Sequence, residues 1–254
     1  AGRYIEFAKA TFPRGQRLDG LKIVVDCAQG ATYKVAPKIL WELGADLVAL
    51  GVDPNGININ HNYGATSPAT LQQAVLDHQA DLGIALDGDG DRLLMVDEQG
   101  KVLDGDQLMA LIATIWLETG LLKGSGVVAT VMSNLGFERY LEQRGLTLYR
   151  AMVGGRSVLE MMKEKGCNVG GEQSGHIILS DYITTGDGLI AALQILSLLK
   201  RKGGKISEIA HVFTPVPQIL KNIKTSKPLN LSSPRVQMAI HQAEKKLSSH
   251  GRLL

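Results

Sequence analysis

Residues 21–50 read LKIVVDCAQGATYKVAPKILWELGADLVAL, and this stretch decides the fold class. It opens with a short β-branched run over 21–25, which indicates a strand. Apolar residues then recur at helical spacing from Val35 to Leu43, and residues 46–50 form the next apolar run. Strand, helix and strand in this order predict a βαβ unit with parallel strands.

The same alternation continues along the chain. Further strands are predicted at 81–86, 126–131 and 146–149, and helices after Ser67-Pro68 and at 106–118, 135–144, 157–165 and 189–199. The first strand candidates are nearly continuous apolar runs, as expected when helices cover both faces of a sheet. The sequence therefore predicts the α/β class, with two tandem β-α-β modules whose mixed, mostly parallel sheets are covered by helices.

Two breaks in the pattern divide the chain into three parts. A polar turn precedes residue 104, and Thr214-Pro215-Val216-Pro217 interrupts the alternation. We therefore predict α/β domains over 1–104 and 105–213, and an incomplete C-terminal α+β piece over 214–254. That piece, with one strand and a polar helix at 237–247, is too short for an independent core.

Composition and charge exclude several classes of protein. The 254 residues are 44% apolar and 20% charged, which argues against disorder. Basic and acidic residues are mixed and sum to a net charge of +2, so no nucleic-acid partner is expected. The longest apolar stretch, 189–199, is about half of the roughly 20 residues that a membrane span needs, so no membrane partner is expected. Two distant cysteines, Cys27 and Cys167, form no C-x-x-C pair and fit a reducing cytoplasm.

Three aspartates follow the strand predicted at 81–86. In ALDGDGDR, residues 85–92, the aspartates are Asp87, Asp89 and Asp91, and glycines separate them. In an extended chain these carboxylates would lie too far apart to share one ion, so the loop must curl, and its glycines give it that freedom. Three converging carboxylates favour a hard divalent cation such as Mg²⁺, at a strand end where α/β proteins place ligands.

The same residues allow other interpretations of this loop. A solvated acidic turn is the simplest. An EF-hand would place Asp87 at position 1 and Glu98 at position 12, but Arg92 stands where that loop needs glycine, and strand-like runs flank it. A haloacid-dehalogenase-like phosphatase also has Asp-x-Asp after a strand, with the first aspartate as nucleophile. Asp91, however, stands where that family usually has Thr or Val.

A second glycine-rich loop occupies the corresponding end of the second module. In NVGGEQSGHI, residues 168–177, Glu172 and Ser174 can offer an acceptor and a donor to the hydroxyls or the amine of a sugar. His176 is either a ligand contact or a packed histidine. Gly154, Gly155 and Arg156 precede the helix predicted at 157–165, whose N-terminal amides either hold an anion such as phosphate or simply start the helix.

Five motifs together resemble those of the α-D-phosphohexomutase superfamily, and within it of the phosphoglucosamine mutase family. They are DCAQGAT (26–32), PNGININ (54–60), ALDGDGDR (85–92), TVMSNLG (130–136) and GGEQSGHIILSDYITTGDG (170–188), and the likeness covers nearly the whole chain. The resemblance implies a cytoplasmic isomerase that interconverts glucosamine 6-phosphate and glucosamine 1-phosphate for cell-wall amino sugars. In that family a phosphoserine gives its phosphate to the sugar, and the resulting bisphosphate reorients and returns the other phosphate.

The resemblance also implies roles for single residues. Asp87, Asp89 and Asp91 would hold Mg²⁺ in a metal-binding domain over 1–104, and Arg92 would support catalysis by offsetting charge near the transferring phosphoryl group. A sugar-binding domain over 105–213 would bind the sugar phosphate through Gly171, Glu172, Ser174, His176 and Arg156. A homodimer of the full-length enzyme stays open.

The sequence departs from the family's pattern in several places. The Ser-His-Asn-Pro segment that carries the phosphoserine and the Ser-Gly-Thr-Glu-Pro loop that binds phosphate do not occur in these 254 residues. We therefore expect two middle domains and the beginning of a fourth, inactive alone. Gly155 and Ser157 stand where the family usually has Asp and Tyr. Three other functions stay open: a phosphomannomutase or phosphoglucomutase of the same superfamily, the phosphatase with Asp87 as nucleophile, and a non-catalytic module that binds a metal or a sugar phosphate.

Overall fold

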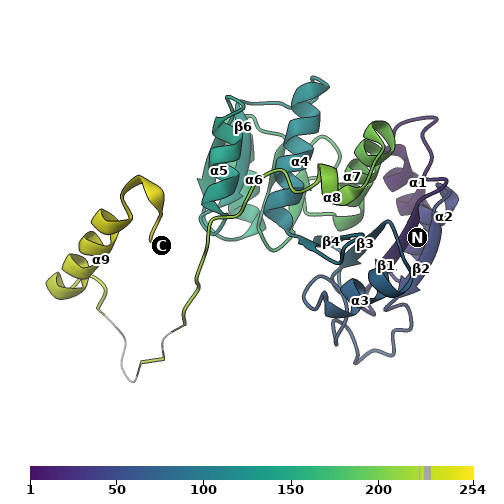
Figure 1. Ribbon diagram of the computed structural model, residues 1–254, viewed down its shortest axis with the longest axis horizontal. Coiled ribbons are helices and arrows are strands. Elements are labelled where there is room, and N and C mark those ends of the chain that lie inside the picture. Colours follow the sequence, from purple (N-terminus) through teal and green to yellow (C-terminus); the bar gives the residue numbers. More distant parts are fainter. Residues whose placement is uncertain (223, 226–229) are drawn as a thin grey trace.

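The first sheet has five strands in the order β2-β1-β3-β4-β5, as shown in the computed structural model, which describes residues 1–222, 224–225 and 230–254 (Figure 1). Strand β1 pairs in parallel with β2 and β3, whereas β3–β4 and β4–β5 are antiparallel. The strands are β1 (Lys22–Asp26), β2 (Asp46–Leu50), β3 (Leu82–Leu86), β4 (Leu93–Asp97) and β5 (Val102–Leu103). The predicted strands at 21–25, 46–50 and 81–86 are thereby confirmed to within one residue.

The second sheet repeats this plan with four strands in the order β7-β6-β8-β9. Strand β6 pairs in parallel with β7 and β8, and β9 closes the sheet antiparallel to β8. The strands are β6 (Gly126–Thr130), β7 (Thr147–Ala151), β8 (Val169–Gly171) and β9 (Ile177–Leu179). The predicted fold class, two α/β modules with mixed, mostly parallel sheets, is confirmed.

Helices cover both sheets, and several of them share one core. Helix α3 (Ala69–Asp77) packs on one face of the first sheet and α6 (Gly155–Lys165) on one face of the second. The other faces meet in a single hydrophobic cluster. Its helices are α1 (Gly2–Ala10), α2 (Val35–Glu42), α4 (Gly105–Glu118), α5 (Leu135–Glu142), α7 (Gly188–Lys202) and the short α8 (Ile206–Ile209). Sequence periodicity predicted neither α1 nor α8.

Helix α7 joins the two sheets. It packs against β3 and β4 of the first sheet and against β9 and α4 of the second. Eleven of its residues are buried, as expected for a helix with neighbours on several sides. The polar turn before residue 104 therefore separates two sheets that share a core, and the division into domains at this point stays a prediction.

Strand β2 lies at the edge of the first sheet and contains no buried residue. Its apolar sequence predicted helices on both of its faces. Strand β2 is more exposed than predicted because an edge strand has a neighbouring strand on one side alone. The helices that cover the sheet therefore reach it only in part.

Aspartate and asparagine side chains cap the starts of α4 and α5. The side chain of Asp104 accepts a hydrogen bond from the Gln107 N–H at the start of α4, and Asn134 accepts one from Gly136 at the start of α5. Each cap satisfies an amide that the first helical turn leaves without a partner. Helix α6 ends at Gly166 in the left-handed conformation, as its sequence predicted.

The C-terminal part, 214–254, contains helix α9 (Pro234–Leu247) followed by a 3₁₀ turn (Ser248–His250). Helix α9 has no buried residue and lies apart from the two sheets (Figure 1). One strand is predicted between residue 217 and this helix, in a segment of which residues 223 and 226–229 lie outside the described residues. The described residues between 214 and the helix form no strand.

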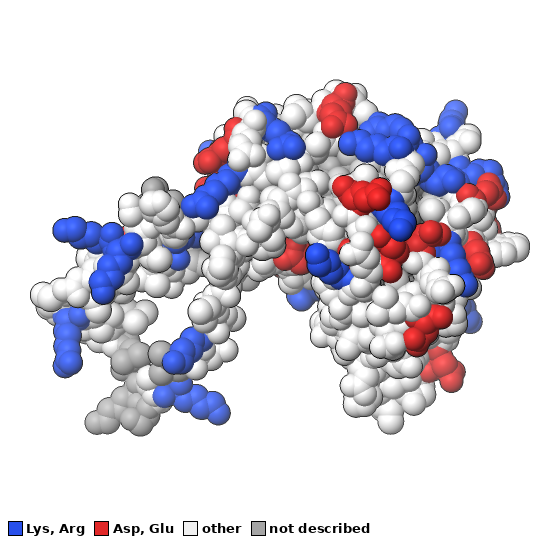
Figure 2. Space-filling model, in the orientation of Figure 1, with Lys and Arg blue, Asp and Glu red and all other residues white. Residues whose placement is uncertain are grey.

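Acidic and basic side chains are interleaved over the two-sheet body on the face drawn in Figure 2, whereas Lys and Arg predominate on the C-terminal part. Within the described ranges of the chain, no helix has the length and apolar character needed to cross a membrane.

Asp106, in the first turn of α4, is a fully buried carboxylate. Its Oδ2 accepts a hydrogen bond of 2.7 Å from the Asn134 N–H, whereas its Oδ1 is buried without a hydrogen-bond partner. Burial, together with the nearby charge of Asp104, raises the pKa of Asp106 to about 6. The unfolded chain therefore loses this proton at a lower pH than the folded chain.

The free energy of unfolding should consequently fall as pH rises from the pKa of Asp106 in the unfolded chain to its value of about 6 in the folded chain. Asp106→Asn should remove this dependence on pH. Relative to the native chain, the variant should gain on the order of 1–3 kcal/mol between pH 4 and 7, because each unit of pKa difference is about 1.4 kcal/mol. Melting temperatures at several pH values measure this gain. Asp46→Asn, at an exposed site, controls for the loss of one charge. An advantage of Asp106→Asn that does not change with pH would contradict the prediction.

Candidate functional site

The three predicted metal ligands come together in the turn between β3 and β4. Asp87, Asp89 and Asp91 each offer one carboxylate oxygen, and these oxygens all lie within 4.8 Å of one another. Asp87 is buried, Asp91 is half-buried and Asp89 is exposed. Antiparallel strands flank the turn, since Leu86 pairs with Leu93, so the helices of an EF-hand are absent around this loop.

The two glycines of this turn act in different ways. Gly90 has a φ of +79°, the left-handed conformation that glycine adopts without strain. Gly88 is needed for close packing, because a Cβ there would lie 2.6 Å from the Ile59 side chain. Its carbonyl also accepts a hydrogen bond of 2.8 Å from the Ala31 N–H. The sequence predicted that both glycines curl the loop. The structure shows that Gly90 does so, whereas Gly88 lets the loop pack closely against Ile59.

The electrostatics of the turn favour a bound cation. Burial raises the pKa of Asp87 to about 6, and the charges of Asp91 and Asp89 add to the rise, although the Arg92 N–H donates to Asp87 at 3.0 Å. The Arg92 Nε lies 3.9 Å from an oxygen of Asp87 and from an oxygen of Asp91. A guanidinium at that distance, 40% exposed, balances this charge only in part. A divalent cation among three hard oxygen donors would relieve the repulsion directly.

The second predicted loop is the turn between β8 and β9. The Glu172 Oε1 accepts a hydrogen bond of 2.9 Å from the Gly154 N–H, and the exposed Ser174 hydroxyl donates to the Glu172 Oε2 at 3.4 Å. One oxygen of Glu172 thus anchors the start of α6, and the other faces the exposed serine. Gly171 is buried, and a Cβ there would lie 2.3 Å from the His176 carbonyl oxygen, so only glycine fits at this position.

Arg156 lies in the first turn of α6, and its side chain is 91% exposed. Its partner is Glu160 of the same helix, at 2.9 Å. Helix α6 starts at Gly155, two residues earlier than predicted, with Gly154 as its N-cap. The Glu172 carboxylate already accepts a hydrogen bond from one amide, that of Gly154, next to this helix N-terminus. Helix N-termini favour negative charge, so the carboxylate is well placed there.

Hydrogen bonds join the turn of the first sheet to the turn of the second. The Leu93 N–H donates to the Gly175 carbonyl at 2.9 Å, and the Gly188 N–H donates to the Gly90 carbonyl at 3.0 Å. His176 Nδ1 lies 2.9 Å from Asp91 Oδ2, so the ring of the second turn contacts a carboxylate of the first. The turn predicted to bind metal and the turn predicted to bind sugar are therefore in direct contact.

Comparison with protein families explains why two such sheets occur together. Residues 2–100 match the model of phosphoglucomutase/phosphomannomutase alpha/beta/alpha domain II, and residues 104–216 match that of domain III. The two matches account for most of the chain. It belongs to the phosphoglucomutase/phosphomannomutase family. This membership leaves the haloacid-dehalogenase-like interpretation without support.

Curated relatives within this family are phosphoglucosamine mutases. The chain is 60% identical to that of Paramagnetospirillum magneticum over 257 residues, which cover 100% of this chain and 57% of the relative. It is 61% identical to that of Granulibacter bethesdensis over 254 residues, covering 100% of this chain and 56% of the relative. The chain thus spans a little over half the length of these relatives.

Solved structures share the fold. A phosphoglucomutase/phosphomannomutase family protein of Burkholderia thailandensis has a TM-score of 0.69 at 26% identity, over 79% of this chain and 43% of that chain. An Aspergillus fumigatus N-acetylphosphoglucosamine mutase, solved with GlcNAc-6P and magnesium, has a TM-score of 0.77 at 23% identity, over 96% of this chain and 61% of that chain. At these identities the likeness supports the phosphohexomutase arrangement of the two sheets.

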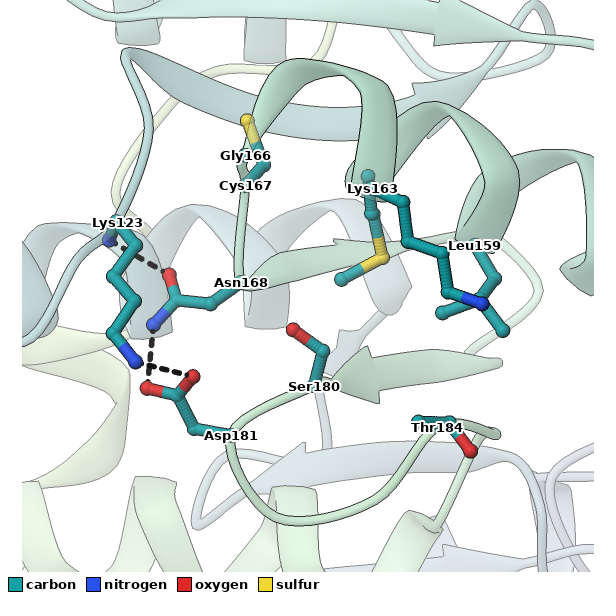
Figure 3. A pocket seen from close by; sticks show the side chains of 10 residues that line it. Lys123, Leu159, Lys163, Gly166, Cys167, Asn168, Ser180, Asp181 and Thr184 are labelled. Atoms are coloured by element: carbon teal, nitrogen blue, oxygen red, sulfur yellow. Dashed lines mark hydrogen bonds and ion pairs between the residues drawn. The ribbon is translucent and has the colours of Figure 1, made fainter.

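A separate cavity of about 330 Å³ lies at the opposite end of β8 (Figure 3). Its polar groups bond to each other: Asp181 accepts from Lys123 at 2.8 Å and from Asn168 at 3.0 Å. Burial raises the pKa of the Cys167 thiol, which keeps it protonated. The side chains of Lys123, Asn168 and Asp181 thus bond to one another within the lining of this cavity. The cavity is remote from the turns that carry the aspartates and Glu172.

Sequence reasoning missed three contributors to the site. Thr32 packs against Gly90, where a Cβ would lie 2.5 Å from its methyl group, and Gly186 and Gly188 pack against His176 and Arg92. The repeated Gly-Asp-Gly pattern at 186–188, directly before an apolar helix, could have indicated a second close approach of backbone. Thr32 belongs to the motif DCAQGAT, but no local pattern there indicated its contact with Gly90.

The packing at Gly90 gives a test of loop geometry. Gly90→Ala should destabilise the chain by about 1–3 kcal/mol, because it adds a methyl group against Thr32 and strains a left-handed residue. Gly120→Ala is the matched control, since Gly120 has a φ of +71° and open space around it. Chemical denaturation of both variants compares the losses. Equal losses would show that the contact with Thr32 contributes nothing.

Proposed function

We propose that the chain forms the metal-binding and sugar-binding parts of a phosphoglucosamine mutase, with Mg²⁺ held by Asp87, Asp89 and Asp91. The observation that carries the proposal is the convergence of these three carboxylates within 4.8 Å, at the place where the loops of both sheets meet. Phosphoryl transfer depends on positioning and on neutralising charge, and this donor set fits a hard divalent cation.

Each residue of the proposed site has a distinct task. Bound Mg²⁺ would withdraw charge from the phosphoryl group that is transferred. Arg92, 40% exposed beside the aspartates, can reach toward a phosphate oxygen and offset its charge. The Glu172 Oε2, whose partner is the exposed Ser174 hydroxyl, and that hydroxyl itself are suited to the amine and hydroxyls of glucosamine. Gly171 and His176 shape this turn, and Arg156 at the start of α6, 91% exposed, would exchange its partner Glu160 for the anion.

The proposed reaction needs a phosphoserine, and the Ser-His-Asn-Pro segment that carries it in the family does not occur in these 254 residues. Its phosphate would pass to the sugar, giving a bisphosphate that reorients between two phosphate-binding positions. The other phosphate then returns to the serine and completes the isomerisation of glucosamine 6-phosphate to glucosamine 1-phosphate. The phosphoglucosamine mutases at about 60% identity support this assignment over the phosphomannomutase and phosphoglucomutase alternatives.

The metal site is tested by direct binding. Isothermal titration of Mg²⁺ into the chain should show binding that Asp89→Ala weakens at least about 10-fold, because loss of even an outer partner of a metal ligand typically costs that much. Asp77→Ala, an exposed aspartate on α3, is the control for charge. Equal Mg²⁺ affinity of the native chain and Asp89→Ala would remove the assignment.

Turnover is tested with the 254 residues alone and with a longer polypeptide that also carries the phosphoserine. The 254 residues alone should give no metal-dependent conversion of glucosamine 6-phosphate when catalytic bisphosphate is supplied, since the phosphate donor is absent from them. A polypeptide that carries these residues together with the phosphoserine should have its highest kcat/KM for glucosamine 6-phosphate. A higher kcat/KM for mannose or glucose 6-phosphate would assign the alternative specificity, and turnover by the chain alone would contradict the proposed mechanism.

A further inference from the structure

His176 lies at the contact between the two turns, and one of its ring nitrogens is already engaged. Its side chain is 12% exposed, and Nδ1 lies 2.9 Å from Asp91 Oδ2. A carboxylate oxygen accepts, so Nδ1 carries the proton and donates to it. The hydrogen bond therefore fixes both the tautomer of the ring and the orientation of the Asp91 carboxylate.

Two glycines make room for the ring. A Cβ on Gly155 would lie 2.6 Å from His176 Nε2, and a Cβ on Gly186 would lie 2.5 Å from Nδ1 and Cε1. Neither glycine has a left-handed backbone, so the need for glycine here is a need for space. The imidazole occupies the volume that side chains at these two positions would fill.

The backbone around His176 is tied to the same turn. Arg92 and His176 form an isolated antiparallel bridge, and the neighbouring Leu93 and Gly175 are hydrogen-bonded at 2.9 Å. A Cβ on Gly175 would lie 2.1 Å from the Leu93 carbonyl oxygen, which shows how closely the two strands approach. The ring is thus positioned by backbone pairing as well as by the glycines.

We propose that His176 is a positioning residue for Asp91, and that Gly155 at the start of α6 permits this role because it carries no side chain. The inference rests on the proposed metal site. Groups that hydrogen-bond to a ligating carboxylate orient it, and their loss typically weakens metal affinity about 10- to 100-fold. Mg²⁺ affinity in the first sheet would therefore depend on a residue of the second.

Mg²⁺ titration of His176 variants tests the hydrogen bond. His176→Phe keeps a ring but removes the donor, and should weaken Mg²⁺ binding about 10-fold or more. His176→Asn places an amide nitrogen where Nδ1 lies and should restore most of the affinity, whereas His176→Gln, whose amide is one methylene farther out, should not. A purely structural role of the side chain would not produce this difference between Asn and Gln.

Gly155→Ala tests whether His176 needs the space next to Gly155, without substituting the histidine itself. The added methyl group should displace the ring and weaken Mg²⁺ binding, although alanine is the better helix residue. Gly2→Ala is the matched control, because Gly2 is also the first residue of a helix and has nothing within 4 Å. If His176→Phe fails to fold, the comparison of Gly155→Ala with Gly2→Ala still tests the positioning role of His176.

The outcomes separate this inference from the metal site itself. If the native chain binds Mg²⁺ and both His176→Phe and Gly155→Ala bind it equally well, the positioning role is overturned and the metal site stands. If the native chain and Asp89→Ala show no Mg²⁺ binding at all, the metal site is overturned and the inference with it.

Discussion

Helix α7 fixes the relation between the two sheets, and the candidate site depends on that relation because each sheet contributes one of its turns. Separating the sheets would expose apolar side chains of α7, at about 1.5–3 kcal/mol for each one fully buried. Each hydrogen bond between the turns contributes only about 0.5–1.5 kcal/mol. The shared core therefore holds the sheets together, and the hydrogen bonds of Leu93 and Gly188 align the turns within that frame. The N-cap of α7, Asp187, also accepts a hydrogen bond from Tyr4 and so ties in helix α1.

The aspartate turn places like charges close together, and this arrangement requires a rigid support. Asp26, fully buried at the end of β1, accepts hydrogen bonds from Ala28 at 2.9 Å and Gly64 at 2.7 Å, and burial raises its pKa. Those bonds shape the segment against which Gly88 packs, since a Cβ on Gly30 would lie 2.2 Å from the Gly88 carbonyl oxygen. This packing supports the backbone of the turn in the conformation that brings the carboxylates together. This is the preorganisation that tight binding of a small cation requires.

The order of strands and helices followed from the sequence because most strands are buried on both faces and read as apolar runs. The aspartate turn was equally visible, since alternating Asp and Gly after such a run is a local pattern. Helix α1 was not predicted, because only Ile5 and Ala8 are buried in it and the apolar period is too short to recognise. The pairing of His176 with Asp91 joins residues 85 positions apart, and no local pattern encodes such a distance.

Gly155 shows how a departure from the family's usual pattern acquires a physical meaning in the folded chain. In the sequence, Gly155 stands where the family usually has an aspartate. In the structure Glu172 already supplies a carboxylate at the start of α6, and a hydrogen bond of 2.9 Å holds it there. An aspartate at 155 would add a second negative charge beside it and would compete with Asp91 for the imidazole that now contacts Gly155. With glycine at this position the histidine has one acidic partner, and that partner belongs to the aspartate turn.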